Sequence, residues 1–354
     1  MSAKMRARDI EVVAPNLKFR VSGVTTTISQ LVPVQSEQFG IAVMGPGLPS
    51  GLPRLRAWMI PALLFKPKGR PFRIWHARRN IDLLIGCILK YLLRAPIRLV
   101  FTSASQRHHS RYTRLLISRM DAVVATSKRT GGYLQVPYHV VSHGVDCSRF
   151  SPGPEFQQDA SHLQNGSTFL IGYVGRIRPQ KGTDLFVRAA IEVLNRHPHC
   201  EAVLLGRATF RNRQFLASLE QEIHRHGLED RIRFLGEQAP ETWYRRFNLY
   251  VCPSLPPEGF GLTVLEAMAC ATAVVASDAG AYPETIVDGA TGAVVRQGDV
   301  SALADAIEAY VAQPDLTVVH GRNGRKHVEA NLSVQAEAQG LARVYDSLWH
   351  QDNP

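Results

Sequence analysis

The order in which short apolar strands and amphipathic helices follow one another is the sequence feature that most restricts the fold. Strand and helix patterns alternate in two series, and the series are separated by residues 151–167, which are rich in Pro, Gly, Ser and Gln. Strands that alternate with helices favour a parallel sheet covered by helices on both faces. The sequence therefore predicts two doubly wound α/β units, at residues 1–150 and 168–354, joined by a linker at 151–167.

Each series supplies enough strands for a sheet of its own. The strands expected in the first unit are residues 10–13, 39–45, 73–77, 98–104, 121–127 and 138–144. Those expected in the second are residues 169–175, 202–206, 232–236, 249–254, 273–277 and 292–295. A last helix is expected at residues 331–351, and its pattern leaves open whether it packs on the second unit or crosses back over the linker. Open α/β sheets bind ligands at the carboxyl ends of their strands, so two such units would face each other across a cleft.

Positive charge is concentrated in the first half of the chain. Residues 1–150 contain 23 Lys and Arg against 6 Asp and Glu, a net charge of +17, whereas residues 151–354 carry a net charge of −6. Such a surface attracts polyanions: nucleic acid, anionic lipid head groups or phosphorylated glycolipids. An ordinary solvated basic face is the alternative. No RNA- or DNA-binding module can be recognised in this half, which argues against nucleic acid as the partner.

The sequence predicts a cytoplasmic protein that could lie on a membrane surface. Its first 15 residues have a basic start but no apolar run long enough for a signal peptide, and residues 83–93 are too short to span a bilayer. Five widely spaced cysteines without a CxxC pair fit a reducing compartment. Residues 54–73 mix Lys and Arg with Trp58, Leu63, Leu64, Phe65 and Phe72. This mixture suits a membrane surface, although a buried helix followed by a basic loop is equally compatible with it.

The first chemical motif of the second unit lies at residues 171–186. A strand ends before Gly175, and Arg176 and Lys181 occupy the loop that leads into the next helix. Two cations beside a helix N-terminus can bind a phosphate, because the helix also presents backbone N–H groups there. Neither a P-loop nor a GxGxxG pattern is present. A solvated loop with two ordinary cations is the alternative interpretation.

The second motif lies at residues 253–286 and contains two glutamates eight positions apart, Glu258 and Glu266. Gly259 and Gly261 let the backbone approach a ligand closely, and a helix begins at about Leu262. Carboxylates at such a place accept hydrogen bonds from the hydroxyls of a ribose or a hexose. A surface turn and a solvent-facing glutamate are the alternatives, but the helix is apolar on nearly every side. Glu266 is therefore expected to be a buried charge that needs a partner.

These motifs resemble a known family. Glu258 and Glu266, framed by PSLPPEGFGLTVLEAMA, resemble the E-x7-E signature of the retaining GT-B glycosyltransferases of family 4. VGRIRPQKGTDLF resembles the family's phosphate-binding segment, HGVDCSRFSPGP the end of its first domain, and LLGRA and FLGEQAPETWYRRFNLYVCPS its nucleotide loops. Within the family, NLKFRVSGVTTTISQL and FTSASQRHHSRYT are most similar to lipopolysaccharide core mannosyltransferases of rhizobia. The resemblance implies the GT-B fold, two Rossmann-like domains facing a cleft.

The resemblance also implies a function and a donor site. A hexose, mannose from GDP-mannose, would be transferred with retention to a Kdo-containing, lipid-linked inner core, at the inner face of the cytoplasmic membrane. Arg176 and Lys181 would stabilise the leaving diphosphate, Glu258 would hold the transferred sugar, and Glu266 would hold the ribose. The remaining donor-binding candidates are Gly175, Gly206, Arg207, Gly236, Glu237, Gly259, Phe260, Gly261, Leu262 and Thr263. No D-x-D pattern occurs, so neither a metal nor another cofactor is expected.

In the first unit, the resemblance points to an acceptor-binding site with less regular motifs. Ser22-Gly23 stands where relatives carry a Gly pair, and Ser103 stands near a place where many have a His. Further candidates for contacts with the diphosphate, the acceptor or the cleft are Lys18, Arg20, His76, Arg107, His108, His109 and Arg111. His76 is interpreted as following a strand and facing the cleft. For His76, His108 and His109 alike, however, an ordinary core or surface position is the favoured interpretation.

Three other functions remain open at this level. The chain could be a family-4 hexosyltransferase of exopolysaccharide or glycolipid synthesis, or a nucleotide-sugar epimerase of the same fold. It could also be a non-catalytic polyanion binder, although the intact glutamate pair in an acidic second half argues against that.

Overall fold

The computed structural model describes residues 6–19, 23–153, 168–256 and 258–351. The chain divides into two compact units, one formed by residues 1–143 and 334–354 and the other by residues 144–333. The boundary lies earlier than the expected 150, because residues 144–150 pack with the second unit. Val145 N donates to Leu332 O (2.9 Å), and the Phe150 ring meets the Tyr244 ring with centroids 6.1 Å apart. Most of the expected linker, residues 154–167, lies outside the described residues.

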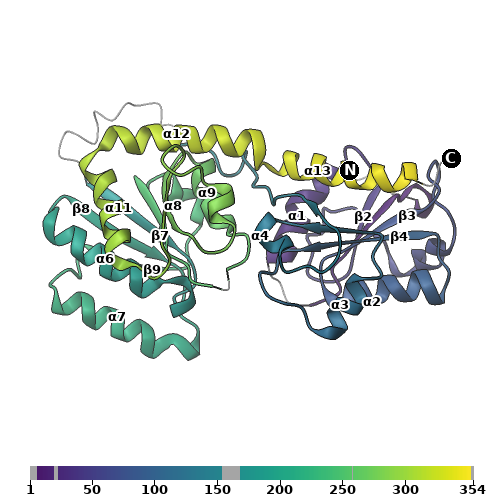
Figure 1. Ribbon diagram of the computed structural model, residues 1–354, viewed down its shortest axis with the longest axis horizontal. Coiled ribbons are helices and arrows are strands. Elements are labelled where there is room, and N and C mark those ends of the chain that lie inside the picture. Colours follow the sequence, from purple (N-terminus) through teal and green to yellow (C-terminus); the bar gives the residue numbers. More distant parts are fainter. Residues whose placement is uncertain (1–5, 20–22, 154–167, 257, 352–354) are drawn as a thin grey trace. The chain divides into compact units, whose positions relative to one another are not determined.

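The first unit is built on a parallel sheet with the strand order β2-β1-β3-β4-β5-β6. Its strands are β1 (Val12–Pro15), β2 (Ile41–Met44), β3 (Arg73–Ala77), β4 (Ile97–Ser103), β5 (Ala122–Ala125) and β6 (His139–Val140). Its helices are α1 (Gly23–Gln35), α2 (Asn80–Cys87), α3 (Arg111–Ile117), α4 (Lys128–Gly131) and α13 (Val334–Gln351). Short turns of other helix types are η1 (Ala7–Asp9), η2 (Ala57–Leu64) and η3 (Ile88–Leu92). Helices α1 and α13 cover one face of this sheet, and α2 and α3 cover the other (Figure 1).

The last helix returns to the first unit, which the sequence pattern had left open. In Figure 1, α13 runs beside α1, and its Leu341 and Leu348 join Leu31 in one apolar core. Polar contacts fix it further. The Tyr345 hydroxyl lies 2.5 Å from His76 Nδ1, and Trp349 Nε1 donates to Phe72 O (3.2 Å).

The second unit is a parallel sheet with the strand order β12-β11-β10-β7-β8-β9. Its strands are β7 (Phe169–Val174), β8 (Cys200–Leu205), β9 (Ile232–Gly236), β10 (Leu249–Cys252), β11 (Ala273–Ser277) and β12 (Ala293–Val295). Its helices are α6 (Thr183–Arg196), α7 (Arg213–Arg225), α8 (Pro240–Tyr244), α9 (Leu262–Ala269), α10 (Tyr282–Thr285), α11 (Val300–Ala312) and α12 (Pro314–Asn331). Single turns lie at η5 (Pro179–Lys181) and η6 (Phe210–Asn212).

Both faces of this second sheet are buried. Along β11, Val275 packs with α6 and α11 on one face, while Val274 packs with α8 and α9 on the other. Strands of this kind are apolar at nearly every position, which explains why runs such as AVVAS could be recognised in the sequence. The predicted fold class, two Rossmann-like α/β domains, is confirmed.

The segment at residues 54–73 is less exposed than a membrane-surface stretch should be. Leu63 and Phe72 belong to the core, and the buried Arg73 donates to Ile10 O (2.9 Å) and Ala7 O (3.0 Å). Trp58 and Phe65 are the strongly exposed apolar side chains of the segment, at 72% and 71%. The sequence pattern is thus explained in part by packing inside the first unit.

Candidate functional site

Three glycines line up at the carboxyl edge of the second sheet. Gly175 follows β7, Gly206 follows β8 and Gly236 ends β9, and these strands are neighbours. Gly175 N donates to Leu205 O (2.9 Å), and Gly206 N donates to Gly236 O (2.7 Å). A Cβ atom on Gly206 would lie 1.8 Å from Gly175 O, and its φ of +136° is itself unsuited to a side chain. The edge therefore presents bare main chain to a ligand.

A buried tyrosine, Tyr173, holds the loop after Gly175 in place through its hydroxyl. The Tyr173 hydroxyl donates to Arg176 O (3.2 Å) and lies 3.0 Å from Thr183 Oγ1. The Arg176 side chain is exposed, whereas Lys181 is partly buried. Gly182 then turns the chain into α6 with a φ of +63°, at a point where a Cβ atom would lie 1.9 Å from Pro253 O. The loop is thus packed against the main chain that follows β10, with Arg176 exposed to solvent.

Lys181 and Glu258 form an ion pair, although 77 positions separate them. Lys181 Nζ contacts Glu258 Oε2, and Glu258 Oε1 accepts from Gly259 N (3.0 Å). The two side chains are 23% and 12% exposed. The two motifs predicted from the sequence therefore meet at one point, with a cation and a carboxylate held together beside the glycine loop.

Helix α9 begins at this same point. Gly261 precedes it with a φ of +80°, and a Cβ atom there would lie 2.1 Å from Tyr282 Cε1. The first N–H groups of an α-helix have no carbonyl partner within the helix, so Leu262 and Thr263 carry the donors at this end. The Phe260 side chain is buried in the core, so only its backbone can serve a ligand. A helix start next to Lys181 provides an anion-binding geometry.

Glu266 lies one turn further along α9 and has a hydroxyl as its partner. Its Oε2 accepts from the Tyr244 hydroxyl (3.1 Å), and Tyr244 at the end of α8 is fully buried. Burial raises the pKa of Glu266, and the hydrogen bond from Tyr244 partly offsets this effect. The sequence predicted a charge in need of a partner, and Tyr244 fills that place.

Replacing Tyr244 with Phe is expected to raise the pKa of Glu266 further, because the ionised carboxylate loses a donor. The folded protein already binds this proton more tightly than the unfolded chain does. The free energy of unfolding should therefore fall as the pH rises from the ordinary glutamate pKa of 4.5 to the raised one, and Tyr244→Phe should deepen that fall. A carboxyl NMR titration measures the shift. Tyr310→Phe is the matched control, since Tyr310 is equally buried but contacts His320. An unchanged titration of Glu266 in Tyr244→Phe would contradict the assignment.

Two further tyrosines support the site, and sequence reasoning missed both. The Tyr250 hydroxyl donates to Val174 O (3.3 Å), and the Tyr282 hydroxyl lies 3.0 Å from Cys252 Sγ, beneath Gly261. Tyr250 lies inside an otherwise apolar strand and Tyr282 starts a short helix. The sequence signal for Tyr173 and Tyr250 was a tyrosine within an otherwise apolar strand, because a buried tyrosine hydroxyl usually has a hydrogen-bond partner.

The two outer loops, after β8 and after β9, carry the candidates Arg207 and Glu237. Arg207 and Glu237 are exposed and 3.8 Å apart at their charged groups. Arg207 O accepts from Ile177 N (3.1 Å), which ties its loop to the one that carries Arg176.

In the first unit, the structure brings Ser103 and His109 together. Ser103 ends β4, and its Oγ lies 3.4 Å from His109 Nε2. His108 is exposed and meets the Tyr133 ring edge-on. His76 does not follow a strand but lies inside β3, with its nitrogens 2.5 Å from the Tyr345 hydroxyl and 2.6 Å from Thr102 Oγ1. Burial, with the nearby Arg78, holds the pKa of His76 well below 6.5, so it is a neutral core histidine that anchors α13.

The loop after β1 is described only in part. Lys18 is exposed, and Gly23 starts α1 with open space where a Cβ atom would point. Arg20 and Ser22 lie outside the described residues. Arg107 and Arg111 are both exposed.

Two arginines directly after β3 were missed by the sequence analysis. Arg79 Nη1 donates to Asn16 Oδ1 (2.7 Å) and its Nη2 to Thr25 Oγ1 (3.2 Å), so it joins the end of β1 to the start of α1. Arg78 is buried, and within the described part of the chain its Nε and Nη1 have no hydrogen-bond partner. Two consecutive arginines directly after a predicted strand were the sequence signal, because ligands of such sheets bind at the carboxyl ends of the strands.

The described residues contain neither a metal-binding cluster nor a membrane-spanning helix. No group of three or more His, Cys, Asp and Glu side chains there is arranged to hold a metal ion. Likewise, none of the helices within the described ranges is long and apolar enough to cross a bilayer.

Comparison with known proteins identifies relatives along the chain. Residues 155–327 match the family model described as glycosyl transferases group 1. The chain is 51% identical over 344 residues to the lipopolysaccharide core biosynthesis mannosyltransferase LpcC of Rhizobium leguminosarum bv. viciae, covering 96% of this chain and 97% of the relative. It is 46% identical to the lipopolysaccharide core biosynthesis mannosyltransferase LpsB of Rhizobium meliloti (strain 1021), covering 96% and 98%.

Among solved structures, the Anabaena protein Alr3699/HepE in complex with UDP superposes with a TM-score of 0.78, over 96% of this chain and all of that one. At 21% identity, this likeness concerns the fold alone.

Proposed function

The chain belongs to the group 1 glycosyl transferases, and from this premise we propose that it moves mannose from GDP-mannose to a Kdo-containing, lipid-linked lipopolysaccharide inner core. That it is a glycosyltransferase follows from the family. The choice of mannose and of the core as acceptor is supported by the names of the two rhizobial relatives, which match nearly the whole chain. The basic first unit supports an anionic acceptor, because Kdo and phosphate groups are negatively charged.

The observation that carries the proposal is the Lys181–Glu258 pair at the start of α9. A nucleotide sugar needs cations and N–H donors for its diphosphate and acceptors for its sugar hydroxyls, and these groups meet here. In the proposal, Arg176, Lys181 and the N–H groups of Phe260, Gly261 and Leu262 bind the diphosphate. Glu258 accepts from hydroxyls of the transferred sugar, and Glu266 accepts from the ribose.

The remaining donor candidates act mainly through the backbone. Gly175, Gly206 and Gly236 leave room for the nucleotide at the strand ends, and Arg207 and Glu237 border it. Gly259 and Thr263 flank the diphosphate-binding turn.

The proposed chemistry retains the configuration at the anomeric carbon. The bond from that carbon to the diphosphate oxygen breaks, and the bond to the acceptor oxygen forms on the same face. The leaving phosphate oxygen takes the acceptor's proton, so no carboxylate nucleophile is required, in contrast to retaining hydrolases. The barrier lies largely in charge separation, which the cations and N–H groups reduce. We propose that these groups neutralise the diphosphate without a metal ion or another cofactor.

The acceptor is proposed to bind to the first unit, on the inner face of the cytoplasmic membrane. Lys18, Arg107 and Arg111 are exposed cations suited to its anionic groups, and Ser103 with His109 offers a polar pair at the end of β4. Arg20, Ser22 and Gly23 belong to the same loop region. Nucleic acid is not proposed as a partner.

A transfer assay tests the proposal. The purified protein is incubated with radiolabelled GDP-mannose or UDP-sugars, with and without extracted lipid-linked core acceptor, and the label is followed into lipid. We expect acceptor-dependent transfer from GDP-mannose and an α-linked product. Transfer only from a UDP-sugar would indicate another hexosyltransferase of the family. Conversion of free nucleotide sugar without acceptor would indicate an epimerase, and no turnover with any donor would leave a polyanion binder.

A further inference from the structure

Large apolar side chains are exposed side by side on the first unit. In η3, which follows α2, Ile88, Tyr91 and Leu92 are 37%, 51% and 74% exposed, and Leu93 directly after η3 is 50% exposed. On α3, Tyr112 and Leu115 are 50% and 58% exposed. We call these six residues the α2–α3 apolar face. Large apolar side chains that gather on a protein surface indicate an interaction site.

The local backbone accounts for this exposure. After Cys87 the helix widens into a π-turn, η3, in which Leu93 N donates to Ile88 O (3.0 Å). Of the five residues in η3, only Leu89 reaches the core. π-turns are rare and occur frequently at functional sites. The segment therefore turns its apolar side chains outward instead of burying them.

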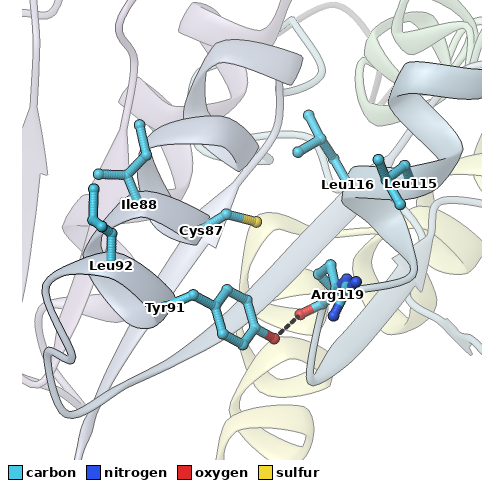
Figure 2. Close-up of a pocket in the computed structure, with 7 residues that line it drawn as sticks. All are labelled: Cys87, Ile88, Tyr91, Leu92, Leu115, Leu116 and Arg119. Atoms are coloured by element: carbon cyan, nitrogen blue, oxygen red, sulfur yellow. Dashed lines mark hydrogen bonds between the residues drawn. The ribbon is translucent and has the colours of Figure 1, made fainter.

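A pocket of about 450 Å³ lies between the two helices. Figure 2 shows Ile88, Leu92 and Tyr91 on one side of it and Leu115, Leu116 and Arg119 on the other. The Tyr91 hydroxyl donates to Arg119 O (3.0 Å), which ties η3 to the end of α3. The pocket wall is thus apolar, held in place by a hydrogen bond, and bordered by an exposed cation.

The surroundings of the face are strongly positive. Residues 87–121 contain seven Lys and Arg and one acid, Asp121. Asp121 is neutralised within the unit, since Lys90 Nζ (2.6 Å) and Arg98 Nη1 (3.1 Å) both contact it. Arg111, Arg114 and Arg119 remain exposed around the apolar residues. A protein partner of ordinary composition would not need this excess, whereas an anionic bilayer complements both the charge and the apolar side chains.

We propose that the α2–α3 apolar face docks the chain on an anionic phospholipid bilayer. Leu92 and Leu115 enter the acyl boundary, the pocket takes the end of an acyl chain, and Arg114 and Arg119 bind lipid phosphates. The docking proposal deepens the proposed function and rests on it, because a lipid-linked acceptor resides in such a bilayer. The segment at residues 54–73 is a weaker candidate, since Leu63 and Phe72 are in the core and Arg70 is paired with Glu11 (2.8 Å).

Vesicle co-sedimentation tests the docking face without donor or acceptor. The full chain is mixed with vesicles of phosphatidylglycerol and phosphatidylcholine, or of phosphatidylcholine alone, and the bound fraction is measured. Leu92→Asp and Leu115→Asp are each expected to weaken binding to the anionic vesicles about tenfold, since apolar burial is replaced by a charge. Arg119→Ala is expected to weaken it about fivefold. The matched control is Phe210→Asp, which changes an equally exposed ring (81%) on the second unit and should bind as the unchanged chain does.

Three outcomes would overturn the docking proposal. The first is unchanged binding of Leu92→Asp and Leu115→Asp. The second is a loss of binding in Trp58→Asp instead, which would favour residues 54–73. The third is equal binding to neutral and anionic vesicles, which would contradict the role of the arginines. Circular dichroism confirms that each variant is folded.

A second readout separates this proposal from the proposed function. Transfer of mannose to a deacylated, water-soluble acceptor should be retained in Leu92→Asp and Leu115→Asp, because these residues lie outside the donor site. If the unchanged chain bound vesicles but transferred no mannose, the proposed function would be contradicted while the docking proposal would still hold.

Discussion

Replacing Lys181 with Ala is expected to reduce the rate of mannose transfer about a hundredfold to a thousandfold, the usual effect of removing one donor that stabilises developing negative charge. Lys181 is paired with Glu258 just before α9, and in the proposed function this is where the diphosphate gains negative charge. Steady-state transfer kinetics measure the effect, and kcat should fall more than KM rises. Removal also leaves Glu258, which is 12% exposed, without its cation, so thermal unfolding must be measured in parallel.

The matched control is Lys326→Ala, because Lys326 is an exposed lysine of α12 in the same unit. It should transfer mannose at the unchanged rate. Lys181→Arg should retain part of the activity, since the charge is kept while the geometry changes. Full activity in a folded Lys181→Ala variant would refute the assignment of the site.

Gly206→Ala is expected to abolish nucleotide binding while leaving the second unit folded but less stable. The added Cβ would lie 1.8 Å from Gly175 O, so the backbone after β7 must move, and the loop that carries Arg176 and Lys181 moves with it. Backbone strain at a φ of +136° adds about 1–3 kcal/mol to the cost of folding. Isothermal titration with GDP and a thermal melt measure the two effects.

Gly298→Ala is the control that separates the effect of backbone strain from the effect of moving a neighbouring segment. Gly298 also has a positive φ (+80°), but no atom lies within 4 Å of a Cβ placed there. This control should lose some stability and keep its affinity for GDP. If Gly206→Ala bound GDP as tightly as Gly298→Ala does, the strand-end glycines would not form part of the donor site.

The fold could be predicted because the second sheet and most of the first are apolar on both faces. Runs such as residues 202–206 and 273–277 are short and almost entirely apolar, as expected of parallel strands that helices cover on both faces. The glutamate motif could be predicted for a different reason. Its glycines are required by the backbone, as the approach of Gly261 to Tyr282 shows, so they leave a readable pattern.

What could not be predicted depends on contacts between distant residues. No helix was expected at residues 314–331, where α12 lies, because Gly321 and Gly324 weaken the helical pattern. Gly321 is needed there, since a Cβ atom would lie 2.1 Å from Ala271 O. The pairing of Lys181 with Glu258 and of Tyr244 with Glu266 depends on how the helices pack on the sheet. No local pattern records such pairings.

The exposure of Ile88, Tyr91, Leu92 and Leu93 could not be predicted from the sequence either. Their composition is that of a buried helix, and the sequence gives no sign that a π-turn directs them to solvent. Conversely, the sequence placed His76 after a strand and facing the cleft, yet it is buried within β3. Its partner there is Tyr345 of α13, 269 positions later, which no local pattern indicates.

The position of the diphosphate tests the central claim most directly. A crystal structure of the chain grown with GDP is expected to show both phosphates within hydrogen-bond distance of Lys181 Nζ or Arg176 and of the backbone N–H groups at Gly261 and Leu262. The ribose hydroxyls should lie against Glu266. A nucleotide bound anywhere else on either unit, with the Lys181–Glu258 pair untouched, would contradict this account.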